Sequence, residues 1–356
     1  MITSRLRRNY ARLIRSVVGS WTFRESLRTD LSDLFEKSPN LYVPRPTLAP
    51  VPSSYDLPGA PTTSPNSRQA VFITARFRSG STFLWNIFRN TPGITAYYEP
   101  LHAQKWRNVQ STDPGRPSVK LGHVGVQSYD DEFAGKEAAG KLFDPAWAER
   151  RLYLTPMHHE PGLRAYIQAL IDMADHRPVL QFNRVDFRLP WLKANFPGVP
   201  IVHLYRHPRE QWMSMIETGG TPPGPEAKPP FDAYKLFYTL EFCRDLQAVF
   251  PFLDPNRARH PYDLAYYLWR LSYSLGVANA DINIAYETLQ SDFQATVESM
   301  MTQLKIDADP AALVQLNRGR DRMRWPDYAP ADWFAEREAE CDRVLDRFFR
   351  APADLE

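Results

Sequence analysis

The sequence predicts an α/β protein with a three-layer, P-loop-like fold, in which a central, mostly parallel sheet is flanked by helices. Three segments carry this prediction, and each is a short apolar strand followed by a polar turn and a helix: 70–88, 201–216 and 282–289. Strands that alternate with helices are typical of parallel sheets, because each crossover places a helix on the sheet. With 356 residues, 43% of them hydrophobic, the chain can hold one such domain with extensions.

The first segment contains a turn suited to binding an anion. Its apolar run 70–75 predicts a strand, and apolar residues at helical spacing from Phe83 onward predict a helix. The turn between them, Arg78-Ser79-Gly80-Ser81-Thr82, would aim backbone N–H groups and the positive end of the helix at one point. The lysine-containing loop of nucleotide triphosphatases is absent. The turn therefore predicts a phosphate or sulfate site, with a purely structural Ser-Gly turn as the alternative.

The second and third segments repeat the strand, turn and helix. Arg206 ends the strand Ile201–Tyr205, and Ser214 lies two turns into the helix that follows, so both side chains could reach a second anion beside the first. In the third segment, Ile282–Leu289, the strand gives way to a helix near Tyr286.

Together and in this order, the three segments resemble the sulfotransferases that use 3′-phosphoadenosine-5′-phosphosulfate (PAPS) as donor. The first turn is similar to the family's 5′-phosphosulfate loop, Arg206 and Ser214 to its 3′-phosphate motif, and Tyr286-Glu287-Thr288-Leu289 to its Tyr-Glu-Asp-Leu segment. The resemblance spans about 70 to 306 and is closest in motif to carbohydrate and tyrosylprotein sulfotransferases. It implies sulfuryl transfer to an acceptor hydroxyl, with the donor bound by Arg78, Ser79, Gly80, Ser81, Thr82, Phe83, Arg206, Ser214 and Tyr286.

Glu99 is the candidate general base. It follows another short strand, and because the carboxyl ends of parallel strands share one edge of a sheet, we expect it beside the anion-binding turn. The resemblance implies that Glu99 accepts the proton of the acceptor hydroxyl and that Arg78 is the catalytic arginine. Two alternatives stay open: a structural pair with a loop arginine such as Arg76 or Arg78, and a histidine base, His102 or His123, as in the cytosolic small-molecule branch.

The acceptor is expected to be a carbohydrate or glycolipid, with a peptide tyrosine or a small hydroxylated metabolite as alternatives. Aromatic and basic residues scattered through the insertion 102–178 suit a sugar's face and hydroxyls, so the insertion is the predicted acceptor-binding part. His102 and Arg184 are the predicted acceptor-side residues. Arg184 stands where related enzymes have a lysine; it keeps the charge and changes the geometry. The arginine-rich segment 318–325 is either a solvated loop or a clamp for an anion.

Residues 1–68 are predicted to lie outside the catalytic domain, which we place at 69–356. Arginines alternate with apolar residues in 1–18, which predicts a basic amphipathic helix without the apolar length needed to span a bilayer. We expect either peripheral contact of residues 1–20 with the inner face of a membrane or packing of this helix on protein. Prolines and serines crowd 40–68 and predict a surface connector.

Composition argues against several other classes of protein. A formal net charge of +2 gives no reason to expect nucleic acid as a partner. The two cysteines, Cys243 and Cys341, disfavour a disulfide framework and fit a cytoplasmic location. His158-His159-Glu160 lacks further ligands at metal spacing, so no metal is expected.

Two functional alternatives stay open beside sulfuryl transfer. A kinase-like phosphoryl-transfer enzyme of the P-loop type should show the lysine motif and an aspartate at a strand end for magnesium, whereas the second strand here ends in Arg206. A catalytically inactive binding module would be expected to lose some donor contacts, whereas Arg78, Arg206 and Ser214 are all present.

Overall fold

A computed structural model describes residues 70–106, 126, 128–217, 221–319 and 323–350. The predicted amphipathic helix in 1–18, the proline-rich connector and His123 lie outside the described residues.

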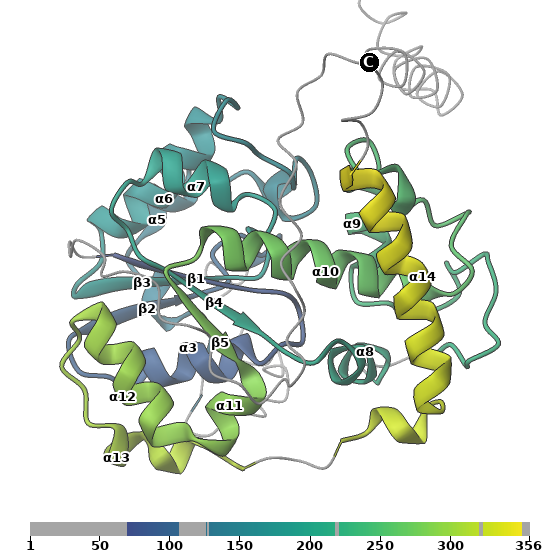
Figure 1. Cartoon of the computed structure of the whole chain (residues 1–356). Coiled ribbons are helices and arrows are strands. Elements are labelled where there is room, and N and C mark those ends of the chain that lie inside the picture. Colours follow the sequence, from purple (N-terminus) through teal and green to yellow (C-terminus); the bar gives the residue numbers. More distant parts are fainter. Residues whose placement is uncertain (1–69, 107–125, 127, 218–220, 320–322, 351–356) are drawn as a thin grey trace, which may run out of the picture. The chain divides into compact units, whose positions relative to one another are not determined.

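The described residues contain a five-stranded, all-parallel sheet in the order β2-β3-β1-β4-β5 (Figure 1). In the register, Ile73 of β1 lies opposite Gln181 on one side and Val202 on the other. The strands are β1 (Val71–Ala75), β2 (Ile94–Tyr98), β3 (Arg177–Phe182), β4 (Ile201–Tyr205) and β5 (Ile282–Ala285). The predicted α/β class and parallel sheet are confirmed.

Helices connect the strands and extend beyond the sheet. In chain order they are α3 (Ser81–Arg89), α5 (Glu137–Gly140), α6 (Pro161–Asp172), α7 (Leu189–Asn195), α8 (Pro208–Ile216), α9 (Thr239–Leu246), α10 (Pro261–Asn279), α11 (Tyr286–Ser291), α12 (Phe293–Leu304), α13 (Pro310–Leu313) and α14 (Ala331–Arg350). Short 3-10 turns are η1 (Asp131–Phe133), η2 (Pro145–Ala148), η3 (Pro251–Leu253), η4 (Val314–Leu316) and η5 (Trp325–Asp327).

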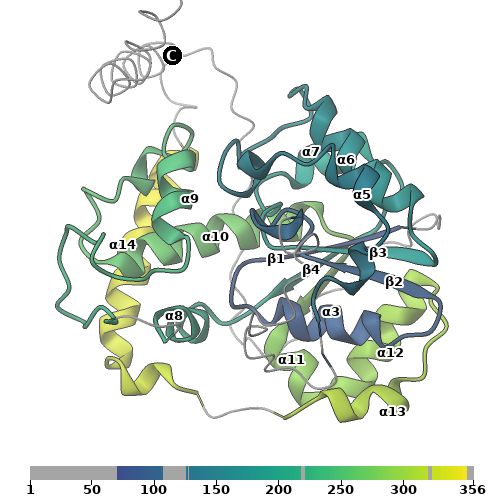
Figure 2. The same ribbon diagram turned by 180° about the vertical axis from the view of Figure 1, so that it is seen from behind.

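The helices cover both faces of the sheet, which explains why its strands are apolar almost throughout. On one face, α3 and α12 pack against Ile73, Val202 and their neighbours (Figures 1 and 2). On the other, α6, α7 and α10 enclose Phe72 and Phe182, whose rings meet edge to face at 5.7 Å. These two cores hold the strand ends, and with them the site, in fixed positions.

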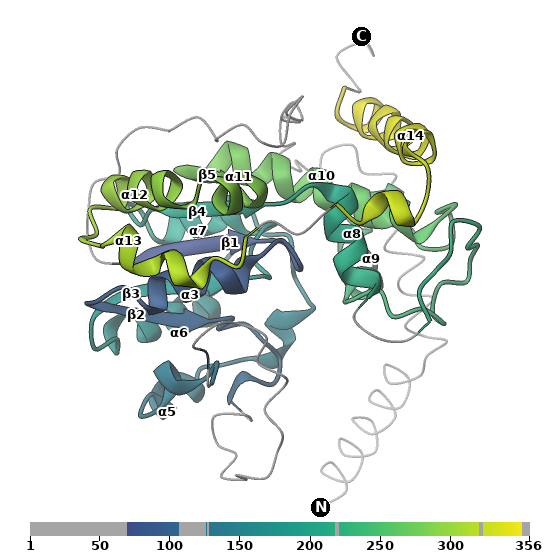
Figure 3. The same ribbon diagram turned by 90° about the horizontal axis from the view of Figure 1, so that it is seen from below.

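Helix α10 continues from the sheet to α14 (Figure 3). It begins at Pro261, where His260 caps it: the His260 ring accepts from the Tyr262 N–H, and the Asp263 carboxylate accepts from the His260 N–H. Its aromatic residues are buried in the core.

The described part of the insertion 102–178 packs against the sheet through α6. Two of its aromatic residues that the sequence offers for acceptor binding, Trp106 and Trp147, are buried in the core, and the Trp106 indole donates to the Tyr166 hydroxyl at 3.1 Å. Their rings are therefore unavailable for stacking on a ligand. None of the described helices is long and apolar enough to cross a membrane.

Candidate active site

All five strands deliver polar or aromatic residues to the same edge of the sheet. Because the strands are parallel, their carboxyl ends coincide, and the residues that follow them are the turn after β1, Glu99 after β2, Asn183 and Arg184 after β3, Arg206 after β4 and Tyr286 after β5. From β1 the chain continues to β2, toward one side of the sheet, and from β4 it continues to β5, toward the opposite side. Open α/β sheets bind their ligands at the carboxyl edge where this reversal occurs.

The turn after β1 has a left-handed backbone at two residues. Arg78 has φ 67° and Gly80 has φ 94°. The Ser79 hydroxyl donates to the Arg76 carbonyl at 2.5 Å and closes the turn. A Cβ on Gly80 would lie 2.2 Å from the ring of Tyr286, so glycine is required both by the backbone and by this close approach. Helix α3 then begins at Ser81, and its first N–H groups have no partner within the helix.

Arg78 links the first of the three sequence motifs, in segment 70–88, to the second, in segment 201–216. Its Nε donates to the carbonyl oxygen of Ser214 at 3.1 Å and to the hydroxyl oxygen at 3.0 Å. Arg206 donates to the Arg78 carbonyl at 3.3 Å, and its guanidinium lies 4.8 Å from the Tyr286 ring centre, which brings in the third motif. Burial lowers the pKa of Arg78, and the charge of Arg206 lowers it further. Two cations held this close favour an anion beside them.

The Glu99 carboxylate is held by the residues that follow β3. Asn183 donates its side-chain N–H to Oε1 at 2.5 Å, and Arg184 donates to Oε2 at 2.9 Å. Burial alone would raise the pKa of Glu99, but the charges of Arg184 and His102 outweigh it and the pKa lies below its ordinary value. The side chain remains 12% exposed. Glu99 is therefore ionised at neutral pH and still reachable.

His102, the rival base, lies in the same place. Burial lowers its pKa, and the charge of Glu99 only partly offsets this, so the imidazole is neutral at neutral pH. His102 Nδ1 accepts from the Gln104 N–H at 3.2 Å. The structure thus brings both candidate bases among the described residues to one edge, while His123 lies outside the described residues.

The expected structural partners of Glu99 are engaged elsewhere. Arg76 pairs with Asp186 at 3.0 Å, and Arg78 donates to Ser214. The ion pair of Glu99 is with Arg184, at 2.9 Å.

Two of the predicted donor residues shape the turn with their side chains. The Ser79 hydroxyl is committed to the Arg76 carbonyl, and Phe83 packs against Phe293 at 5.9 Å while its N–H donates to the Gly80 carbonyl. The Thr82 hydroxyl lies toward Glu99 instead: it is 2.8 Å from the hydroxyl of Tyr98, the residue before Glu99.

Several further residues at this edge were not predicted from the sequence. Asn183 was missed although it stands directly before Arg184 at a strand end. Tyr238 has φ 63°, and its ring lies 5.2 Å from the Arg184 guanidinium and 5.4 Å from the Phe77 ring. Glu210 lies 3.4 Å from Arg206. Arg206 stands just before α8 and Glu210 in its first turn, and this spacing of four residues was a usable signal.

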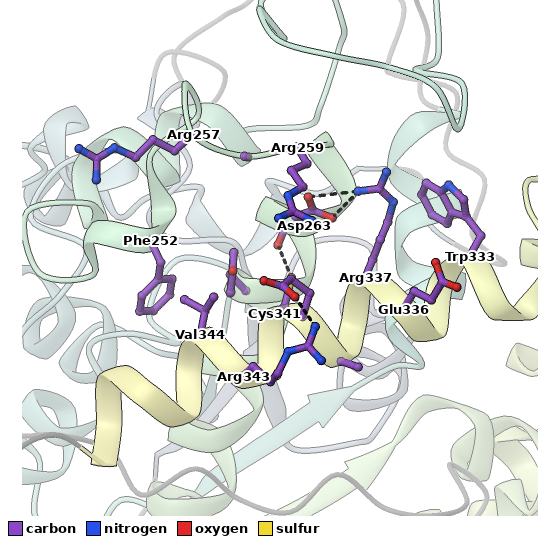
Figure 4. Close-up of a pocket in the computed structure, with 14 residues that line it drawn as sticks. Phe252, Arg257, Arg259, Asp263, Trp333, Glu336, Arg337, Cys341, Arg343 and Val344 are labelled. Carbon is purple, nitrogen blue, oxygen red and sulfur yellow. Dashed lines mark hydrogen bonds and ion pairs between the residues drawn. The ribbon is translucent and has the colours of Figure 1, made fainter.

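A cavity of about 700 Å³ lies apart from these residues, between the start of α10 and α14 (Figure 4). Arg337 lies there 3.1 Å from Asp263 and 4.4 Å from the ring centre of Trp333. None of the predicted site residues lines it. Among the described residues, no group of His, Cys, Asp and Glu side chains is arranged to hold a metal ion.

Comparison with known proteins agrees with this geometry. Residues 70–238 match the model of the sulfotransferase family, and this segment runs from the first motif past Ser214. Residues 70–238 belong to the sulfotransferase family. No curated protein sequence matches the chain significantly.

Solved structures similar to this chain share little sequence with it. The sulfotransferase domain of the Synechococcus PCC 7002 olefin synthase is 16% identical, with 83% of this chain and 93% of that one covered and a TM-score of 0.36. The sulfotransferase domain from the curacin biosynthetic pathway is 14% identical, with 82% and 94% covered and a TM-score of 0.39. A sulfotransferase from Alicyclobacillus acidocaldarius is 14% identical, with 81% and 98% covered and a TM-score of 0.35.

Proposed function

We propose that this chain transfers a sulfuryl group from PAPS to a hydroxyl of an acceptor, most suitably a carbohydrate or glycolipid, with Glu99 as general base. Membership of the family supports sulfuryl transfer as the general reaction. The observation that carries the proposal is the junction of Arg78, Ser214 and Arg206, because it unites the two motifs expected to bind the two ends of the donor.

The residues present fit an anionic donor. Arg206 Nε is buried and has no hydrogen-bond partner among the described residues, so it has a donor available for a ligand. The Ser214 hydroxyl accepts from Arg78 and keeps its own proton to donate. In this proposal, Arg206 and Ser214 bind the 3′-phosphate, Tyr286 flanks them, and the turn from Arg78 to Thr82 binds the 5′-phosphosulfate.

When bound, PAPS would supply an activated sulfuryl group that moves to the attacking oxygen as its bridge to the 5′-phosphate breaks. Negative charge then grows at that bridge. Arg78 and the N–H groups of Ser81 and Thr82 are fixed donors at the start of α3, and losing one such donor typically costs roughly 3 kcal/mol of barrier.

Glu99 would take the proton of the attacking hydroxyl. Its strand, β2, is two strands from β1, which places it roughly 10 Å along the sheet from the turn. Each Glu99 oxygen already accepts one hydrogen bond and has a lone pair left. Because Arg184 lowers the pKa of Glu99, it is a weak base, and proton transfer would accompany formation of the sulfur–oxygen bond, when the hydroxyl becomes acidic.

The acceptor would approach from the Glu99 side. His102 and Arg184 lie there, and the Arg184 guanidinium is 4.8 Å from the ring centre of Phe77 and 5.2 Å from that of Tyr238. The remaining part of the 102–178 insertion is the proposed acceptor-binding region within a catalytic domain of residues 69–356.

The proposed donor is tested by calorimetric titration with 3′,5′-adenosine bisphosphate, the product of PAPS, beside 5′-AMP and ATP with magnesium. We expect the bisphosphate to bind best, and Arg206→Ala to weaken it by about 10- to 100-fold. Arg164→Ala, on the exposed face of α6, is the matched control and should change nothing. A preference for ATP with magnesium would favour phosphoryl transfer, and no binding of any nucleotide would remove the enzymatic proposal.

The proposed base is tested by Glu99→Gln and His102→Ala. The glutamine keeps the size and the acceptor oxygen but cannot take a proton, so kcat should fall by about 10²- to 10⁴-fold with bisphosphate affinity unchanged. His102→Ala should retain most of the rate. The reverse pattern, with activity kept in Glu99→Gln and lost in His102→Ala, would assign the base to the histidine.

A further inference from the structure

Glu210, in the first turn of α8, is buried beside the donor-side arginines. Its side chain is 8% exposed, and Oε2 lies 3.4 Å from a terminal nitrogen of Arg206. Arg206 in turn donates to the Arg78 carbonyl. A buried carboxylate in this position is a counter-ion for the arginine that we assign to the anion site.

The other oxygen of Glu210 holds a distant part of the chain. Oε1 accepts the backbone N–H of Arg324 at 2.6 Å and that of Trp325 at 3.2 Å. Two successive N–H groups bonded to one carboxylate fix the backbone of that segment, because bonds to an ionised acceptor are the stronger kind. The Trp325 ring also lies 4.8 Å from the Arg209 guanidinium, which comes from the same turn of α8.

Three arginines from separate segments therefore converge. Arg78 comes from the turn after β1, Arg206 from the end of β4, and Arg324 from the segment before α14. Glu210 Oε2 lies 3.4 Å from Arg206 and 3.9 Å from Arg324. Arg206 donates to the Arg78 carbonyl at 3.3 Å, so the three arginines lie close together. Two carboxylates lie among these arginines: Glu210 contacts Arg206, and Glu217 pairs with Arg324.

We propose that Glu210 is a positioning residue that couples the donor-side arginines to the backbone of Arg324 and Trp325, through the reach of its carboxylate. When Glu210 holds this segment, Arg324 stays beside Arg78 and Arg206, and the anion site is complete. The inference rests on the proposed function for the identity of the anion, whereas the contact of Glu210 with the segment does not depend on it.

Two substitutions of Glu210 distinguish the effect of its side-chain length from the effect of its charge. Glu210→Asp keeps the charge but withdraws the carboxylate by one methylene, so it cannot bond both N–H groups and contact Arg206 as well. Glu210→Gln keeps the reach and an acceptor oxygen but loses the charge. Glu298→Ala, an exposed glutamate on α12, is the matched control. Hydrogen–deuterium exchange of residues 323–328 reports the contact, and calorimetry with 3′,5′-adenosine bisphosphate reports the anion site.

In Glu210→Asp we expect faster exchange at Arg324 and Trp325, and bisphosphate affinity lower by about tenfold, the effect of one good hydrogen bond. In Glu210→Gln the amide oxygen takes both N–H bonds, so exchange stays slow and affinity stays within about threefold of the parent. Rescue by the glutamine is the result that a purely electrostatic role would not give.

Three outcomes would overturn the inference. Unchanged exchange in Glu210→Asp would show that Glu210 does not hold the segment. Faster exchange with unchanged bisphosphate affinity would show that the segment is not coupled to the anion site. If Glu210→Gln lowered the affinity and Glu210→Asp did not, the effect would come from the charge of Glu210. Failure of the proposed function looks different: the parent protein itself would not bind the bisphosphate. In that case the proposed coupling to a donor site is also wrong, and hydrogen–deuterium exchange alone tests whether Glu210 holds the segment.

Discussion

Arg78 donates its Nε to both the carbonyl and the hydroxyl oxygen of Ser214, which stands 136 residues further along the chain. The contact joins the turn after β1 to the second turn of α8. It orients the Arg78 guanidinium and leaves the Ser214 hydroxyl with its own proton for a ligand. The residue assigned to the 5′ end of the donor is thus positioned by a residue assigned to the 3′ end.

Ser214→Ala should weaken binding of 3′,5′-adenosine bisphosphate by about tenfold, because it removes one hydrogen bond to the ligand and one acceptor of Arg78. The free energy of unfolding should change by less than about 1 kcal/mol, since Arg78 keeps the Ser214 carbonyl. Calorimetry and urea denaturation measure the two effects. Ser299→Ala, on the exposed face of α12, serves as control. Equal affinity of Ser214→Ala and the parent would remove Ser214 from the donor site.

The required glycine of the turn gives a prediction with a matched control. Gly80 and Gly93 both have positive φ, 94° and 74°, but a Cβ on Gly93 would meet nothing within 4 Å, whereas one on Gly80 would meet the Tyr286 ring. Gly93→Ala should therefore lower the free energy of unfolding by about 1 kcal/mol, and Gly80→Ala by about 2 to 4 kcal/mol. Urea denaturation compares them. Equal losses would mean that Tyr286 moves aside without cost.

The fold could be predicted from sequence because its signals are local. Each strand, turn and helix of the three motifs is encoded within about twenty residues, as in Ile201–Ile216, and parallel strands bring their ends together whatever their order. This rule places Arg78, Arg206 and Tyr286 at one edge of the sheet, and the neighbouring positions of β1, β4 and β5 bring them together.

The partner of Glu99 could not be predicted because it depends on strand order. With β3 between β1 and β2, Arg184 is a nearer neighbour of Glu99 than Arg76 or Arg78, and nothing local places β3 there. The same limit applies to Trp106, since composition does not distinguish an aromatic ring in the core from one exposed for an acceptor.

The ion pair of Arg184 with Glu99 predicts a shift in the pH dependence of the reaction. The pKa of Glu99 lies below its ordinary value, so the acidic limb of kcat/KM in the parent should lie at lower pH than an ordinary glutamate would give. Arg184→Gln removes the charge that favours the carboxylate, so the pKa of Glu99 rises and the limb moves to higher pH. Arg164→Gln is the exposed control. An unmoved limb would mean that the titrating group is not under the influence of Arg184.

The pH dependence of stability should contain a term from His203, which is 2% exposed and whose Nδ1 lies 2.8 Å from the Asn283 side-chain oxygen. Burial lowers the pKa of His203 to about 4, against 6.5 for an ordinary histidine. Between these values the unfolded chain binds a proton that the folded protein does not, so stability falls as the pH falls. The slope of this term approaches about 1.4 kcal/mol per pH unit.

His203→Gln isolates that term. The glutamine can still bond Asn283 but does not titrate, so the free energy of unfolding of the variant should depend less steeply on pH between 6.5 and 4 than that of the parent. His260, whose pKa is also lowered to about 4 by burial, is present in both proteins and cancels in the comparison. Urea denaturation at several pH values measures both slopes. Parallel curves would show that His203 takes up its proton in the folded protein as readily as in the unfolded chain.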